Sequence, residues 1–148
     1  MLNALARWPF ERGERHMPTT RRRLAELTRR FVTAFNDNDL DAVLACFADD
    51  GIYDEFNGTR NRGRDAIRAA LLPQFTGRYG TMRFIEDDLF VDPEAGKVMA
   101  SWRCTLELKG QPTSWRGLDL MYFEGDALVR KSTYAKARAP LFEEAADA

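Results

Sequence analysis

The chain has 148 residues, of which 45% are hydrophobic and 30% are charged, and this is the composition of a single globular domain. The formal net charge of −1 argues against a broad basic surface, so we expect no nucleic-acid partner. No segment approaches the ~18 continuous apolar residues of a membrane span. We therefore predict a cytoplasmic protein with no membrane partner.

The domain is predicted to lie between two variable ends. Residues 1–18 lack the apolar run of a secretory signal and are interpreted as a disordered or variable extension, with Met17 as an alternative start. The domain itself is expected over residues 19–140. Residues 141–148 are expected to form an acidic, frayed tail.

Three helices are expected in the first half of the domain. Apolar side chains recur at helical spacing over 20–36, and Asp39 can cap a second helix that follows. A third helix is expected over 64–72, where Pro73 disturbs or ends it. A short strand over 52–56 separates the second helix from the third.

From Thr81 onward the hydrophobic pattern changes to the period-two alternation of strands. Turn residues such as Pro93 and Gly96 separate the strands. A four-stranded antiparallel meander behind three helices makes an α+β fold. A bent sheet covered by helices leaves an apolar pocket in which a small hydrophobic ligand can bind. The four segments are "MRFIEDDLFVD", "VMASWRCTLELK", "SWRGLDLMYF" and "LVRKSTYAKA".

The strand "WRGLDLMYF" is apolar on both faces, because side chains alternate across a strand. One face is expected to meet the helices. The other is expected to meet a second copy of the sheet, which predicts a homodimer.

Asp119 lies within this apolar strand, and Asp54 lies in "IYDEFNG", between apolar side chains. A buried, unpaired carboxylate is costly, so Asp119 must be paired, hydrogen-bonded or shifted to a higher pKa. A salt bridge to Arg103 or Arg116 and a role as a pocket acid both remain open. For Asp54 the alternatives are a solvated group at the edge of a loop and a pocket carboxylate.

Three stretches, "ADDGIYDEFNG", "GRDAI" and "GQPTSWRGLDLMYFEG", resemble the ketosteroid isomerase and SnoaL-like group of the nuclear transport factor 2-like superfamily. The resemblance covers about residues 20–138. It implies a cone-shaped, curved antiparallel sheet packed against three N-terminal helices, with the site inside. The superfamily contains isomerases, cyclases, dehydratases and non-catalytic binding proteins, so the resemblance does not fix the activity.

Carried over to this sequence, the resemblance gives Asp54 the role of proton-abstracting base and Asp119 that of oxyanion-stabilising acid. Phe31 stands where the family has a tyrosine, so one oxyanion donor is missing. The other residues expected at the ligand include possible replacement donors. They are Phe35, Trp102, Trp115, Lys131 and Tyr134. Alternation puts Lys131 and Tyr134 on opposite faces of the last strand without deciding which face enters the cavity, and the family resemblance favours the Lys131 face.

The single histidine, His16, lies in the extension, which argues against His–Asp chemistry in the pocket. No pattern of metal ligands is present, and we expect neither a metal nor a cofactor. Two functions remain. One is a cofactor-independent isomerase, cyclase or lyase that acts on an apolar carbonyl compound. The alternative is a non-catalytic dimeric ligand-binding or accessory domain of the same fold.

Overall fold

The computed structural model describes residues 19–144. The predicted extension, with Met17 and His16, lies outside the described residues, and so do residues 145–148 of the tail. Within residues 19–144, no helix combines the length and the apolar character needed to cross a membrane. The cytoplasmic location and the domain boundaries stay predictions.

The three predicted helices are confirmed. Helix α1 spans Arg21–Asn36, α2 spans Leu40–Cys46 and α3 spans Arg64–Phe75. Each of the first two begins at a side-chain cap. The Thr20 hydroxyl accepts a hydrogen bond from the Arg23 N–H at 3.1 Å, and the Asp39 carboxylate accepts one from the Ala42 N–H at 2.9 Å.

The predicted end of the third helix at Pro73 is wrong, because α3 continues through Pro73 to Phe75. Pro73 stands in the last turn, where its missing N–H removes a single hydrogen bond and only two helical residues follow. The helix therefore tolerates the proline, and the residue that follows it, Gln74, remains on the helix.

The strands form one six-stranded sheet in the order β2-β1-β6-β5-β4-β3. The predicted antiparallel meander is confirmed as β3 to β6. The sheet as a whole is mixed, because β1 pairs in parallel with β6, whereas the prediction was an antiparallel sheet. The strand bounds are Phe47–Asp54 for β1, Arg60–Arg62 for β2, Arg83–Asp92 for β3, Lys97–Leu108 for β4, Gln111–Glu124 for β5 and Ala127–Ala135 for β6.

The first strand differs most from its prediction. It was expected over 52–56, but β1 begins at Phe47 and ends at Asp54, and the short β2 was not predicted. The register of β1 against β6 shifts between Phe47 and Ile52. This irregular stretch carries two exposed aspartates, Asp49 and Asp50, and so lacks the alternation by which strands are recognised.

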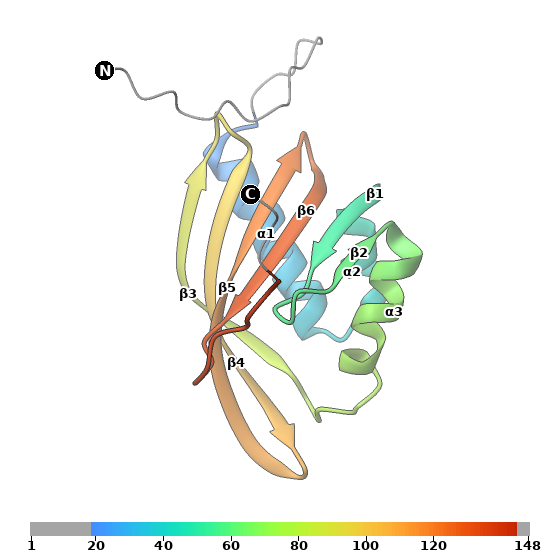
Figure 1. Ribbon diagram of the computed structural model, residues 1–148. Helices are drawn as coiled ribbons and strands as arrows, with labels where there is room; N and C mark the ends of the chain where they lie inside the picture. Colours follow the sequence, from blue (N-terminus) through green and yellow to red (C-terminus); the bar gives the residue numbers. More distant parts are fainter. Residues whose placement is uncertain (1–18, 145–148) are drawn as a thin grey trace, which may run out of the picture.

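The sheet curls around the helices, and α1 lies across one face of it (Figure 1). The apolar stripe of α1 packs on that face, and one end of the space between the helices and the sheet is filled by a continuous core, here called the packed end. Beyond α1, the long β4–β5 hairpin extends past the helices (Figure 1). The core at the packed end includes Leu24, Leu27, Val43, Phe47, Val98, Met121, Phe123 and Leu128.

Candidate functional site

A cavity of about 460 Å³ lies between the concave face of the sheet, α1 and α3. Its volume falls in the range typical of sites for small organic molecules. The walls are mostly aromatic, and the Phe84 and Trp102 rings meet edge to face with centroids 5.0 Å apart. The apolar lining includes Phe31, Phe35, Tyr53, Phe56, Leu71, Tyr79, Met82, Phe84, Trp102, Leu106 and Trp115.

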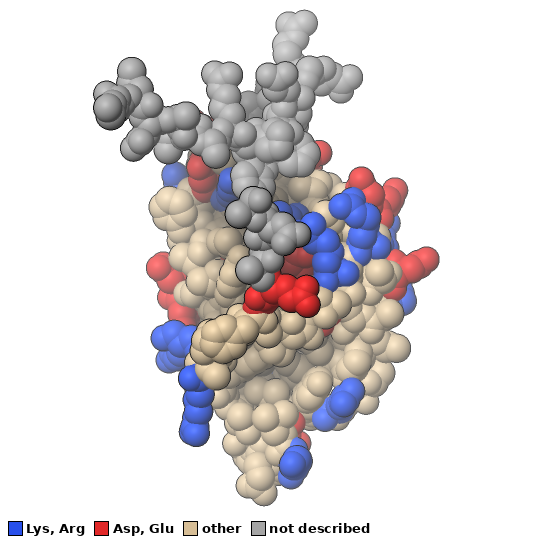
Figure 2. Space-filling view, viewed as in Figure 1, with Lys and Arg blue, Asp and Glu red and all other residues tan. Residues whose placement is uncertain are grey.

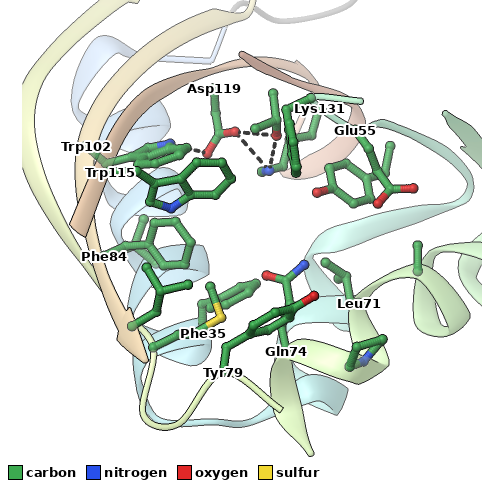
Figure 3. A pocket seen from close by; sticks show the side chains of 18 of the residues that line it. Phe35, Glu55, Leu71, Gln74, Tyr79, Phe84, Trp102, Trp115, Asp119 and Lys131 are labelled. Atoms are coloured by element: carbon green, nitrogen blue, oxygen red, sulfur yellow. Dashed lines mark hydrogen bonds and ion pairs between the residues drawn. The ribbon is translucent and has the colours of Figure 1, made fainter. Parts of the chain in front are cut away.

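One end of the cavity carries a buried ion pair. Lys131 Nζ lies 2.9 Å from Asp119 Oδ1, and the two side chains are only 9% and 11% exposed. Thr133 Oγ1 donates to Asp119 Oδ1 at 2.6 Å, and Trp102 Nε1 donates to Asp119 Oδ2 at 3.1 Å. Lys131 also donates to Thr133 Oγ1 at 2.7 Å. Both oxygens of Asp119 are therefore engaged, and the network closes on itself (Figure 3).

The ammonium group of Lys131 stays charged in this setting. Burial alone would lower the pKa of Lys131, but the Asp119 carboxylate opposes this effect, and the balance raises the pKa above its usual value. The group also lies 4.6 Å from the centroid of the Tyr53 ring and 5.8 Å from that of Phe31. Lys131 is thus a fixed positive charge at the wall of an apolar cavity.

Strand register assembles the ion-pair network. Asp119 on β5 lies opposite Thr133 on β6, so both side chains point to the concave face. Trp102 on β4 lies opposite Gly117 on β5. A Cβ at Gly117 would lie 2.6 Å from the Trp102 ring, so the glycine leaves room for the indole to reach Asp119. The predicted alternatives for Asp119, Arg103 and Arg116, are not its partners, because alternation puts them on the outer face.

The two predicted acids do not meet. Asp54 does not line the cavity, and its carboxylate instead pairs with two arginines on the outer side of the sheet. Its Oδ1 lies 2.7 Å from Arg60 Nε and its Oδ2 lies 3.0 Å from Arg130 Nη2, while Ser132 Oγ donates to Oδ2 at 3.2 Å. This placement argues against Asp54 as a base acting inside the cavity.

Glu55, the next residue, lines the cavity instead. Asn61 Nδ2 donates to Glu55 Oε2 at 3.0 Å, and no residue among 19–144 donates to Oε1. In Figure 3 Glu55 lies to one side of the cavity, near Lys131, and its carboxylate is one of the charges that raise the pKa of Lys131. The signal that could have identified Glu55 is alternation from the buried Tyr53, which leaves Asp54 on the opposite face.

Of the eight predicted site residues, six line the cavity and two do not. The two that do not are Asp54 and Tyr134, and Tyr134 is 57% exposed on the outer face of the sheet. Sequence reasoning also missed Gln74 and Tyr79, which line the cavity from α3 and the following loop. The six that line it are Phe31, Phe35, Trp102, Trp115, Asp119 and Lys131.

Acid titration should reveal the structural role of Asp54. Burial would raise the pKa of Asp54, but Arg60, Arg130 and Ser132 together lower it below its usual value. The stability that this pairing contributes is therefore present above about pH 4 and is lost as the pH falls through the lowered pKa. We expect Asp54→Asn to lower the free energy of unfolding by about 1–3 kcal/mol at pH 7 and by less at pH 3.

Urea unfolding at both pH values measures this difference. The matched control is Asp49→Asn, because Asp49 pairs with Arg64 but its side chain is 93% exposed. The control should change stability by less than about 1 kcal/mol at either pH. An Asp54→Asn effect as small as that of the control, or equal at both pH values, would contradict the assignment.

Within residues 19–144, no group of three or more His, Cys, Asp or Glu side chains is arranged to hold a metal ion. Cys46 and Cys104 are free thiols, and burial raises the pKa of Cys104 to about 11. The predictions that the protein uses neither a metal nor a cofactor stay predictions.

Several solved structures share this fold. A protein from Xanthomonas campestris pv. campestris, provisionally assigned as a polyketide cyclase, is 24% identical and superposes with a TM-score of 0.66 over 78% of this chain and 92% of its own. A protein of unknown function with a cystatin-like fold, from Methylobium petroleophilum PM1, is 17% identical, with a TM-score of 0.70 over 88% and 86% of the two chains. TerC, crystallised with polyporic acid, is 14% identical, with a TM-score of 0.67 over 77% and 92%.

These identities are low, so the likenesses establish the fold and leave the activity open. A comparison with curated protein sequences finds no match. The sequence profile of the SnoaL-like domain, in contrast, matches residues 28–131, which is more than half of the chain and contains Glu55, Asp119 and Lys131. The chain therefore belongs to the SnoaL-like domain family.

Proposed function

We propose that this protein binds a small, largely apolar carbonyl compound in the cavity and transforms it by acid–base chemistry without a cofactor. The observation that carries the proposal is that the Glu55 carboxylate and the Lys131 ammonium border the same apolar cavity. A general base and a cation placed around one ligand are the two groups needed to form an enolate.

In the proposed reaction Glu55 removes a proton from a carbon next to the ligand's carbonyl group. The electrons of the broken C–H bond move to the carbonyl oxygen, and the Lys131 ammonium stabilises the resulting enolate. Where the ligand is an unsaturated ketone, return of the proton from Glu55 to the γ-carbon of the dienolate completes an isomerisation. Attack of the enolate carbon on a second carbonyl completes a cyclisation, and loss of a leaving group from the β-carbon completes an elimination.

Asp119 takes a different role in this proposal from the one that the family resemblance implied. Its carboxylate accepts hydrogen bonds from Trp102 and Thr133 and pairs with Lys131, which supports an ionised group that positions the ammonium. Lys131 Nζ lies over the ring of Phe31, 5.8 Å from its centroid. The ammonium can thus supply a donor near the position where the family has a tyrosine hydroxyl.

The alternative is a non-catalytic ligand-binding domain. It is favoured by the closed network around Asp119, because a carboxylate with both oxygens engaged is not a free acid. The two functions share the cavity and differ in whether Glu55 reacts with the ligand.

Ligand-induced thermal shifts over a panel of enones, cyclic ketones such as 2-tetralone, and polyketide-like aromatics test the shared part of the proposal. We expect at least one class to raise the melting temperature of the wild type, because a ligand that binds only the folded state stabilises it. Compounds that raise the melting temperature of the wild type should then be assayed for turnover by the wild type and by Glu55→Gln. The absence of any shift across the panel would refute a small-molecule pocket, and binding without turnover would favour the alternative.

We also propose that two copies of the protein associate through the outer face of the sheet. Apolar side chains gather on this face, with Ile85 43%, Phe90 64% and Tyr134 57% exposed, next to the half-buried Leu118 and Leu120. An exposed apolar sheet face of this kind is typical of an interface. On the part of the described chain visible in Figure 2, basic and acidic side chains are interspersed and form no continuous basic surface.

Light scattering after size exclusion measures the association. The wild type is expected to elute as a dimer, and Phe90→Lys combined with Leu120→Lys as a monomer, because two buried, unpaired charges oppose association. Phe142→Lys is the matched control, since Phe142 is 86% exposed in the C-terminal segment that follows β6. A monomeric wild type, or a dimer that survives the double substitution, would contradict this interface.

A further inference from the structure

A polar residue interrupts the apolar stripe by which α3 faces the cavity. Ile67 and Leu71 are buried in the core, Ala70 and Leu71 line the cavity, and Gln74 continues the same stripe because helix positions four and seven residues apart share a face. Gln74 is half-buried there. An amide in such a position needs a hydrogen-bond partner, which is water in the open cavity and a ligand group once a ligand displaces that water.

The protein itself does not supply that partner. Among residues 19–144, no group hydrogen-bonds to the side-chain amide of Gln74, and none hydrogen-bonds to the Tyr79 hydroxyl in the loop that follows α3. In Figure 3 both side chains project into the cavity from the side opposite Asp119 and Lys131, and the Gln74 amide points to its centre. These two groups differ in this respect from the ion-pair network, whose members satisfy one another.

The chemistry of these groups restricts what they can recognise. An amide offers two donors and one acceptor oxygen, and a phenol offers a donor and an acceptor, all without charge. Such a set fits a neutral hydroxyl or carbonyl group better than an ionised one. Gln74, Phe35 and Met82 also border a second, more polar hollow of about 410 Å³.

We propose that Gln74, assisted by Tyr79, is the specificity-determining residue of the cavity and selects ligands with a neutral hydroxyl or carbonyl group at the end remote from Lys131. This inference rests on the proposed function and extends it. The favoured ligand has an apolar, ring-containing body with an oxygen function at each end, one at Lys131 and the other at Gln74.

Two ketones that differ by one hydroxyl test this inference. 2-Tetralone has a single oxygen, whereas 6-hydroxy-2-tetralone has a second oxygen at the opposite end of its bicyclic ring. Quenching of tryptophan fluorescence reports binding, because Trp102 and Trp115 line the cavity. The wild type is expected to bind the hydroxy compound about three- to ten-fold more tightly, as one additional neutral hydrogen bond allows.

Gln74→Met keeps the length of the side chain and removes its amide. We expect this variant to bind both ketones with the same Kd, within about two-fold, and to bind 2-tetralone as the wild type does. Tyr79→Phe should reduce the preference only in part. Gln111→Met is the matched control, because Gln111 is exposed at the start of β5, outside the cavity lining, and it should keep the wild-type preference.

The outcomes separate this inference from the function on which it rests. A preference for the hydroxy compound that persists in Gln74→Met, or a wild type that binds the two ketones equally, would overturn the role of Gln74 and leave the proposed function standing. Failure of the wild type to bind either ketone would count against the proposed function and this inference together. Melting temperatures near that of the wild type verify that the variants are folded.

Discussion

Replacing Glu55 with glutamine should slow the exchange of the α-hydrogens of 2-tetralone with D₂O by a factor of ~10²–10⁴ relative to the wild type. The substitution keeps the size of the side chain and leaves an oxygen that can still accept the hydrogen bond from Asn61, but it removes the only base that borders the cavity without a cationic partner in the described residues. Proton NMR follows the exchange directly, whether or not the ketone goes on to a product.

Asp54→Asn is the matched control for this experiment, because Asp54 is the neighbouring carboxylate and lies outside the cavity lining. We expect exchange in that variant to stay within about three-fold of the wild type, far from the loss caused by removing a base. If Asp54→Asn lost the activity and Glu55→Gln retained it, the base would be the one that the family resemblance implied, and the assignment to Glu55 would be wrong.

Replacing Lys131 with methionine should lower the free energy of unfolding by roughly 3–5 kcal/mol at neutral pH, because it leaves the Asp119 carboxylate buried without its cation. Methionine preserves much of the aliphatic stem, so the loss reports the charge more than the packing. Equilibrium unfolding in urea at pH 7 measures the change, and an unchanged m-value verifies that the folded state keeps its compactness.

The double variant Lys131→Met with Asp119→Leu provides the control. Since replacing both members of a buried ion pair with apolar residues is often nearly neutral, it should regain most of the stability that the single variant loses. At the same time it should remain inactive, because the cation that stabilises the enolate is gone. A single variant as stable as the wild type would show that Asp119 does not depend on Lys131.

Much of the fold could be predicted because local patterns determine it. The stripe of Leu24, Leu27 and Phe31 identifies α1 from spacing alone, and alternation identifies the meander. The parallel pairing of β1 with β6 could not be predicted in this way, because it joins segments about eighty residues apart and β1 itself is irregular at Asp49 and Asp50.

The site was predictable in composition but not in detail. Trp102 and Asp119 reach the cavity because the alternation of β4 and β5 is regular, and Lys131 lies opposite Met121 of β5 on the same concave face. In "YDEF" the prediction assigned the pocket role to Asp54 and not to the adjacent Glu55, and a shift of one residue along a strand reverses the face. Asp54 pairs with Arg60 across a turn and with Arg130 on β6, and neither pairing is visible without the register.

Gln74 illustrates the same limit on a helix. The proline before it indicated the end of the helix, and a residue beyond a helix end has no defined face. Since α3 continues to Phe75, the amide instead takes a fixed position on the cavity side. Predicting the position of that side chain required knowing where the helix ends, and the helix end depends on packing around the last turn.

A crystal structure of the protein with 2-tetralone tests the central claim most directly. We predict that the ketone lies within the aromatic walls, with its oxygen at hydrogen-bonding distance from Lys131 Nζ and its α-carbon toward Glu55. A ketone bound elsewhere, or bound in the cavity with its oxygen turned away from Lys131, would contradict the claim.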